Sequence, residues 1–162
     1  MKSDFTHTPK HLEVSVPAQE VRLYAGEELL MSFLVSTSKF GLGSEEGSNK
    51  TPLGTFRICE KYGTNAPKGT IFKGRKPEGI WNPEKDLQSD QVLTRIFRLE
   101  SKERGLENTY LRYIYFHGTN QESRIGSPAS HGCIRLSNRD IISLYPQVSV
   151  GTTVHIFNHL FS

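Results

Sequence analysis

The sequence predicts a mostly-β domain of two packed sheets with one short helix, and three observations support this. Several short runs alternate apolar and polar side chains, the period of a strand with one buried face. Fourteen glycines and eight prolines lie largely between these runs, as turns between strands require. Only one segment, near the C-terminus, carries the signals of a helix start.

The first strands are expected close to the N-terminus. Residues 1–11 are polar and irregular, so we expect a flexible arm there. Residues 12–16 and 20–24 alternate apolar and polar side chains, and residues 28–36 form a longer apolar run. Short turns separate the three runs, a spacing typical of an antiparallel sheet.

Two long irregular segments follow. Residues 37–54 are rich in Gly, Ser, Lys and Glu and are too long for a hairpin turn. Residues 61–90 contain seven Gly or Pro residues, and we interpret them as a lid or wall over a substrate site. Strands are expected beside them, at residues 55–59 and 91–99.

The C-terminal third contains the expected helix. Residues 110–116 are aromatic and β-branched, which predicts a central strand that ends at His117. Residues 137–140 resemble a capping box that opens a short helix, which continues through residues 141–145 and is stopped by Pro146. Residues 152–157 predict the final strand.

Length and composition limit the function classes. A chain of 162 residues fits one domain with an ordinary core, which we place at residues 12–158. The net charge of +3, without a basic block, argues against nucleic-acid binding. The longest apolar run, residues 29–35, is too short for membrane insertion. No signal segment opens the chain, so we expect a cytoplasmic protein, or an envelope protein if a leader is missing.

The chemically reactive side chains gather in two short motifs. These are HGT at residues 117–119 and SHGCIR at residues 130–135. They place a thiol, two imidazoles and a guanidinium within 19 residues, among glycines that allow close approach of backbone to a ligand. This composition is expected of an activated nucleophile, Cys133, beside an oxyanion pocket.

Two histidines compete to be the general base. We favour His117, because a rigid strand aims it across at Cys133 and the carbonyl of Gly118 is placed to fix its tautomer. His131 lies two residues before Cys133 and needs a tight turn to reach the sulfur. A nearby imidazole is expected to lower the thiol pKa from about 8.5 by about two units.

The remaining motif residues have expected binding roles. The amides of Gly132 and Cys133, with His131, are placed to receive an oxyanion. Arg135 carries a planar fork that holds a substrate carboxylate or fixes the loop. The reaction class that follows is acyl transfer from an amide through a thioester.

Structural alternatives stay open for these residues. A lone cysteine is usually a small buried hydrophobe, which is our interpretation of Cys59. A metal site made of His117, His131 and Cys133 is a further alternative, although no C-x-x-C or H-x-x-x-H pair supports it. We expect Arg112 to be structural.

Other candidate groups lie outside the motifs. Lys73 and Arg75 are expected to be solvated, with a minor substrate role left open by their place in the lid segment. Four histidines near the termini are expected at the surface: His7, His11, His155 and His159.

Together the two motifs resemble the signature of the YkuD-type L,D-transpeptidase catalytic domain. Residues 51–56, TPLGTF, resemble a further element of that family, and residues 13–37 its opening strands. The resemblance covers residues 12–158. It implies an L,D-transpeptidase-like β-sandwich of two mixed sheets.

The resemblance also implies site roles. It places the nucleophile on Cys133, the general base on His117 and a pocket-shaping histidine on His131. Ser130, Gly132 and Arg135 fall on the remaining motif positions. No cofactor and no metal are implied.

The activity implied is on peptidoglycan stem tetrapeptides. The bond between the L-centre of a diamino acid and the terminal D-alanine is exchanged for a thioester, and D-alanine is released. An amine or water then resolves the thioester. Carbapenem-type β-lactams are implied as inhibitors.

The chain departs from the usual family pattern in two ways: no leader and no wall-anchoring module are visible. These departures favour, as an alternative, a cytoplasmic L,D-carboxypeptidase that trims recovered muropeptides. The alternative from another class is a non-catalytic module that binds wall fragments or a metal.

Overall fold

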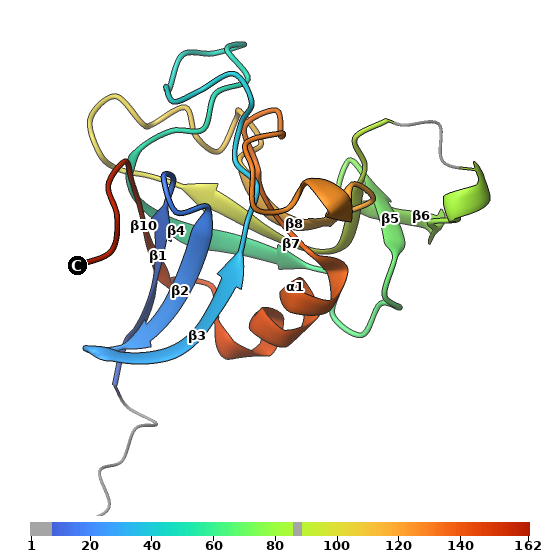
Figure 1. The fold of residues 1–162 in the computed structure, drawn as a ribbon, viewed down its shortest axis with the longest axis horizontal. Coiled ribbons are helices and arrows are strands. Elements are labelled where there is room, and N and C mark those ends of the chain that lie inside the picture. The colour runs from blue at the N-terminus through green and yellow to red at the C-terminus, as the bar shows by residue number, and fades with distance from the viewer. Residues whose placement is uncertain (1–7, 86–88) are drawn as a thin grey trace, which may run out of the picture.

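The structure, a computed structural model, describes residues 8–85 and 89–162. The described residues form ten strands, one α-helix and three short 3-10 helices (Figure 1). The expected mostly-β class with a mixed sheet and one short α-helix is confirmed. The expectation of two separate sheets is not, because hydrogen bonds join all ten strands into one continuous sheet.

The N-terminal half of the sheet contains the three strands expected from alternation. These are β1 (Lys10–Ser15), β2 (Glu20–Ala25) and β3 (Glu28–Leu34), paired antiparallel as consecutive hairpins. The C-terminal strand β10 (Thr153–Phe157) inserts parallel beside β1 and antiparallel to β4 (Gly54–Tyr62). Strand β1 begins two residues before the expected strand start at residue 12, and residues 1–7 lie outside the described residues.

The central strand β7 explains why the sheet is continuous. β7 (Val92–Glu100) pairs with β4 along its second half and with β5 (Thr70–Lys73) at its start, while β8 (Tyr115–Thr119) occupies its other edge. β6 (Lys76–Ile80) extends from β5, and β9 (Ile134–Leu136) runs parallel to β8. A bulge in β7 between Leu93 and Ile96 redirects the strand, so both halves of the sheet share it.

Alternate side chains of the central strands face two different clusters. Phe97, Phe116 and Ile134 belong to the main core, which β1, β2, β4, β10 and the helix complete. Ile96 and Tyr115 point the other way, into a smaller cluster with Phe72 of β5. Period-two alternation therefore gives β7 and β8 two buried faces.

The helix α1 (Asn138–Leu144) begins where the capping signal predicts. Ser137 is its N-cap and accepts a hydrogen bond from the amide of Asp140 at 3.1 Å. Ile141 and Leu144 are buried, and the helix packs against β7 and β8. α1 has seven residues, and no helix among residues 8–85 and 89–162 is long and apolar enough to cross a membrane.

Two sequence expectations are wrong. Residues 110–113 form turns, and β8 begins only at Tyr115, because the amide of Arg112 bonds back to the carbonyls of Asn108 and Thr109, at 3.0 and 3.2 Å. Within the expected irregular segment 61–90, residues 61–85 are more regular than expected. Gly74 and a neighbour with positive φ close a tight turn there, so β5 and β6 form a hairpin beside the body of the molecule (Figure 1).

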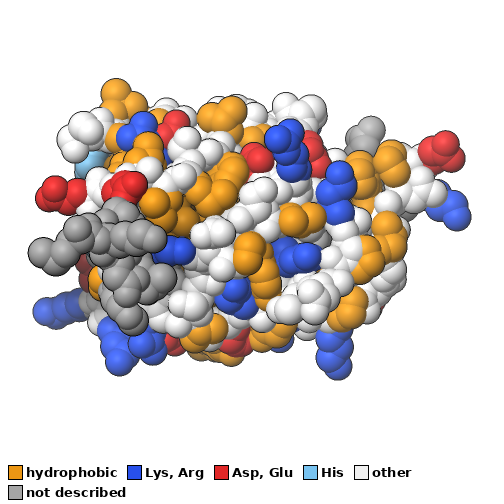
Figure 2. Space-filling view, turned by 90° about the horizontal axis from the view of Figure 1, so that it is seen from below, with side chains coloured by type: hydrophobic (Ala, Val, Ile, Leu, Met, Phe, Trp, Pro, Cys, Tyr) orange, Lys and Arg blue, Asp and Glu red, His pale blue; other side chains and the backbone are white. Residues whose placement is uncertain are grey.

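The surface seen from below mixes apolar and basic side chains. Hydrophobic side chains lie in patches among lysines and arginines on that face (Figure 2). The most exposed strand is β6, all of whose residues are exposed.

Candidate active site

The register of two parallel strands assembles the candidate site. β8 and β9 pair His117 with Arg135. Two residues earlier in each segment, Tyr115 lies beside Cys133. Side chains two residues apart on a strand share a face. The four side chains therefore lie together on one face of the sheet, with the thiol diagonal to the imidazole.

Cys133 is half-buried and lies between two backbone groups. Its Sγ accepts a hydrogen bond from the amide of Tyr115 at 3.4 Å and donates one to the carbonyl of Tyr113 at 3.3 Å. The side chain packs against the smaller cluster of Phe72, Ile96 and Tyr115. Burial raises the pKa of the Cys133 thiol to about 12, although the amide of Tyr115 opposes this. The expected lowering of the thiol pKa is therefore wrong for the unliganded protein.

His117 is buried, at 2% exposure, and its orientation is fixed. Its Nδ1 lies 2.5 Å from the carbonyl oxygen of Gly118. A carbonyl only accepts, so Nδ1 carries the proton and Nε2 is left as the basic atom. Burial lowers the pKa of His117, although the Gly118 hydrogen bond opposes this. At neutral pH the thiol and the imidazole are thus both uncharged.

Asp90 is the site residue that the sequence did not reveal. Its Oδ2 lies 3.2 Å from Nδ1 of His131, and its Oδ1 accepts a hydrogen bond from Nη1 of Arg135 at 3.0 Å. Asp90 sits in the loop after β6, a segment whose sequence carries no chemical motif. Only the tertiary structure brings it to the two motif residues.

A side chain beside the HGT motif fixes the loop that carries Asp90. Oδ1 of Asn120 accepts a hydrogen bond from the amide of Gln91 at 2.9 Å. Its Nδ2 donates to the carbonyl of Ser89 at 2.7 Å. The backbone on both sides of Asp90 is therefore fastened to the end of β8.

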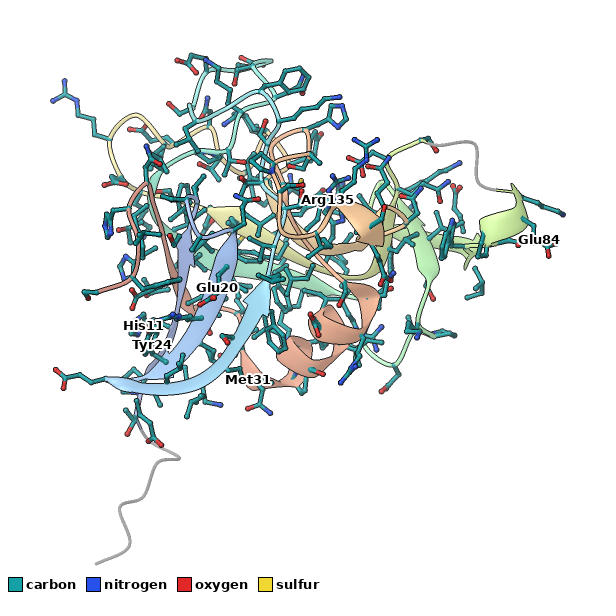
Figure 3. The ribbon with its side chains drawn as sticks, viewed as in Figure 1. His11, Glu20, Tyr24, Met31, Glu84 and Arg135 are labelled. Atoms are coloured by element: carbon teal, nitrogen blue, oxygen red, sulfur yellow. The ribbon has the colours of Figure 1, made fainter. Side chains whose placement is uncertain are left out.

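Arg135 is completely buried and lies in the interior of the molecule (Figure 3). Its Nη1 donates to Asp90 and to Oε1 of Gln121, the latter at 2.9 Å. Nε and Nη2 are also buried, without a hydrogen-bond partner among the described residues. The guanidinium contacts the loop through Asp90 and Gln121, and a role toward a substrate carboxylate stays a prediction.

The turn that carries Cys133 is held by its own residues. Oγ of Ser130 donates to the carbonyl of Cys133 at 2.6 Å and accepts from the amide of Gly132 at 3.3 Å. Gly132 has φ +119°, and an added Cβ would lie 3.3 Å from the carbonyl oxygen of Lys50. Glycine is therefore required there. Because Ser130 engages the Gly132 amide, an oxyanion role for this amide stays a prediction.

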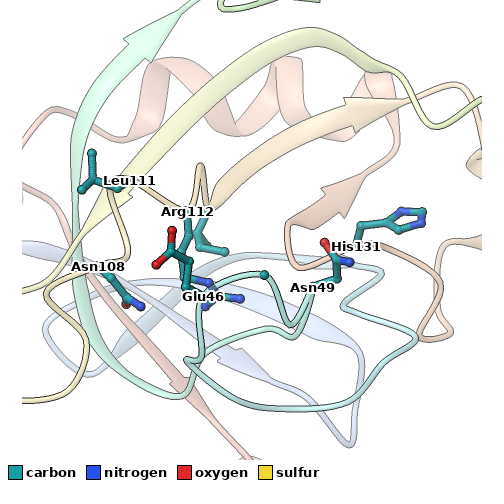
Figure 4. Close-up of a pocket in the computed structure, with 8 residues that line it drawn as sticks. Glu46, Asn49, Asn108, Leu111, Arg112 and His131 are labelled. Atoms are coloured by element: carbon teal, nitrogen blue, oxygen red, sulfur yellow. The ribbon is translucent and has the colours of Figure 1, made fainter.

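A cavity of about 310 Å³ opens beside His131 (Figure 4). Its polar lining includes Glu46, Asn49 and Arg112. Nη2 of Arg112 donates to the carbonyl of Lys50 at 2.8 Å, so Arg112 holds the loop before β4 against the wall of the cavity. The structural role expected for Arg112 stays a prediction, since the side chain also lines the cavity.

The metal-site alternative and the environment of Cys59 can be compared with the structure. His117 faces Gly118 and His131 faces Asp90, and no group of three or more possible metal ligands occurs within the described residues. Cys59 is half-buried and donates to the carbonyl of Arg98 at 3.4 Å, and burial raises its pKa to about 11.

The terminal histidines lie away from this site. His11 stacks on Tyr24 at 5.3 Å between ring centroids, on the N-terminal strands and apart from Arg135 (Figure 3). His155 accompanies it, and Phe157 stacks on His159. His7 lies outside the described residues.

Comparison with known proteins agrees with the motifs. The family profile of the L,D-transpeptidase catalytic domain, YkuD, matches residues 9–156. YkuD of Bacillus subtilis strain 168 is 50% identical over 148 residues, which cover 91% of this chain and 66% of YkuD. YcfS of Escherichia coli K12 is 52% identical over 134 residues, 76% of this chain and 38% of YcfS. Both relatives bear L,D-transpeptidase names. The chain spans only 18% of a third relative, YbiS of Escherichia coli K12.

Solved structures share the fold. An L,D-transpeptidase from Mycobacterium smegmatis superposes with a TM-score of 0.59 at 21% identity, over 91% of this chain and 58% of that one. The structure of LdtMt1 in complex with imipenem gives a TM-score of 0.57 at 19% identity, with the same two coverages of 91% and 58%. The match to the family profile over nearly the whole length shows that this chain belongs to the L,D-transpeptidase catalytic domain family.

Proposed function

We propose that this chain is a cysteine acyltransferase that acts on peptidoglycan stem tetrapeptides. The observation that carries the proposal is the shared face of Cys133 and His117, with the tautomer of His117 set by Gly118. This arrangement is that of a nucleophile beside an oriented base. Membership of the family supports the substrate class.

The reaction proposed begins from the uncharged pair. Sγ attacks the carbonyl carbon between the L-centre of the diamino acid and the terminal D-alanine, as Nε2 of His117 takes the thiol proton. The tetrahedral intermediate collapses when the imidazolium returns that proton to the leaving amine. The products are a thioester on Cys133 and D-alanine. An amine of a second stem peptide, or water, then releases the acyl group.

An uncharged thiol and imidazole suit this sequence of steps. A thiol whose pKa is raised by burial is a poor nucleophile until substrate arrives and its proton moves to His117. A neutral imidazole with a lowered pKa is available as a base over the whole neutral range. The cysteine is therefore protected from indiscriminate attack while the site is empty.

The test is mass spectrometry of purified protein with a disaccharide tetrapeptide. Replacing Cys133 with alanine should lower D-alanine release by about a thousandfold or more, while Cys59→Ala should leave it unchanged. Tripeptide as the product means hydrolysis, the L,D-carboxypeptidase alternative, and cross-linked dimers mean transfer. Turnover that persists in Cys133→Ala would remove the proposed mechanism.

We also propose that β-lactams acylate this site. Two structural relatives are LdtMt1 in complex with imipenem and an Ldtfm–avibactam carbamoyl enzyme. A carbapenem should add one adduct mass to the wild-type protein and none to Cys133→Ala. An adduct on both proteins would place the acylation elsewhere.

A further inference from the structure

Arg75 extends from the hairpin turn to the residues around the thiol. It stands at the turn between β5 and β6, and its Nη1 donates to the hydroxyl of Tyr115 at 3.1 Å. Its guanidinium carbon lies 5.5 Å from the ring centroid of Tyr113, within cation–π range. A residue 40 positions away in sequence thus contacts both tyrosines.

The same two tyrosines hold the sulfur of Cys133 through their backbone. The amide of Tyr115 donates a hydrogen bond to Sγ, and the carbonyl of Tyr113 accepts one from the thiol. The guanidinium of Arg75 therefore contacts the side chains of the same two tyrosines whose main-chain groups contact the thiol. The side chain of Tyr115 therefore spans the separation between the guanidinium and the thiol.

Backbone strain concentrates at these two contacts. Arg75 has φ +65° and Tyr113 has φ +56°. A residue with a Cβ pays about 1 kcal/mol or more for this conformation, which glycine or asparagine adopts more easily. Strain of this kind tends to occur at ligand-binding positions. The two residues are in contact, since the Arg75 guanidinium lies over the Tyr113 ring, and the Tyr113 carbonyl accepts a hydrogen bond from the thiol.

Charge distinguishes Arg75 from the other arginines around the thiol. Arg98 is 4% exposed and Arg135 is fully buried, and each has a carboxylate partner. Arg112 donates to two main-chain carbonyls and a hydroxyl of its neighbouring loop. Arg75 is half-buried, and among the described residues no carboxylate lies within ion-pair distance of it. Its charge is available to an anionic ligand.

We propose that Arg75, with Tyr113 as its platform, binds the C-terminal carboxylate of the residue that leaves. This inference rests on the proposed function and names the group by which the same site recognises its substrate. In a tetrapeptide, that carboxylate is the one nearest to the scissile carbonyl, separated from it by one nitrogen and one carbon. A planar guanidinium binds a carboxylate through two parallel hydrogen bonds. Chains that end one residue after the cleaved bond are thereby selected.

Binding tests this without requiring turnover. In Cys133→Ala protein, a tetrapeptide with a free C-terminal carboxylate should bind about tenfold more tightly than its C-terminal carboxamide. Adding Arg75→Gln should bring the two dissociation constants together, because it weakens only the binding of the peptide with the free carboxylate. Arg75→Lys should keep part of the difference, because it retains the charge without the fork. Lys76→Gln removes an exposed charge one residue away and should change neither constant.

The outcomes separate this inference from the proposed function. Equal binding of acid and carboxamide to Cys133→Ala, or a difference that survives Arg75→Gln with an unchanged circular dichroism spectrum, overturns the role of Arg75. A wild-type protein that releases no D-alanine, yet discriminates the two peptides through Arg75, contradicts the proposed chemistry and supports the binding site. In the active enzyme, Arg75→Gln should lower kcat/KM about tenfold for the acid and leave the carboxamide rate unchanged.

Discussion

At the scale of single residues, burial controls the reactive groups more strongly than their neighbours do. The sequence suggests a thiol ionised by an adjacent imidazole, because both occur in one motif. In the structure, Cys133 packs beside Phe72 and Tyr115, and desolvation favours the uncharged form of the thiol. Desolvation acts on His117 in the same sense. Desolvation thus keeps both groups uncharged, and neither needs the other as an ion-pair partner.

The pH dependence of thiol alkylation tests this. With a pKa of about 12, the Cys133 thiolate is scarce at neutral pH, and its fraction grows about tenfold per pH unit up to that value. The rate of iodoacetamide modification of folded Cys59→Ser protein should therefore rise without a plateau from pH 7 to pH 10. The Cys59 change is needed because that thiol also has a raised pKa, about 11. A plateau below pH 8 would show an ionised cysteine instead.

The contact between Asp90 and Arg135 is the second residue-scale feature with a measurable consequence. The guanidinium is fully buried and the aspartate side chain is 23% exposed, so removal of the carboxylate leaves a buried charge short of a partner. Since Gln121 still accepts from Nη1, we expect Asp90→Ala to lower the free energy of unfolding by about 1.5 kcal/mol. Asp90→Asn should cost less because an amide oxygen can still accept.

Urea unfolding followed by circular dichroism measures this difference. Glu78→Gln is the matched control, because it breaks a surface ion pair with Lys73 at 3.5 Å in which both side chains are about half exposed or more. Such pairs contribute about 0–1 kcal/mol. If both variants lost equal stability, Asp90 would be no more than a surface contact.

At the scale of elements, local signals were enough wherever one face of a strand is buried. Alternation located β1, β2 and β10 to within about two residues, and the Ser137 signal located the start of α1. The motifs likewise pointed to the strand end and the turn that carry His117 and Cys133. These features depend on near neighbours in the chain, which a single sequence displays.

Elements that depend on contacts with residues distant in the sequence could not be predicted from local sequence patterns. The aromatic run before β8 resembles a strand, yet Arg112 and the positive φ of Tyr113 turn it to serve the thiol and the cavity wall. The β5–β6 hairpin has a Gly-Arg turn that sequence rules associate with Gly or Asn at both positions. Asp90 carries no motif at all. Its place depends on Asn120, about 30 residues later.

At the scale of the whole molecule, the site lies where a thinly attached hairpin meets the continuous sheet. Two residue pairs join β5 to β7, those of Ile71 with Leu93 and Phe72 with Val92. Every residue of β6 is exposed. The main core, by contrast, gathers buried side chains from both ends of the chain. The hairpin is therefore expected to open more easily than the body, since it buries little apolar surface.

This difference predicts two separable unfolding signals. Trp81, the only tryptophan, follows β6 and donates its amide to Gly69, so its fluorescence reports the hairpin, whereas far-ultraviolet circular dichroism reports the sheet. In urea, we expect the fluorescence midpoint to fall below the dichroism midpoint. A bound acid tetrapeptide should bring the midpoints together in Cys133→Ala, because Arg75 then joins the hairpin to the ligand at the sheet. The carboxamide peptide should do so far less. Coincident midpoints in the empty protein would mean that hairpin and sheet unfold as one unit, and the hairpin would then present Arg75 as a rigid part of the site.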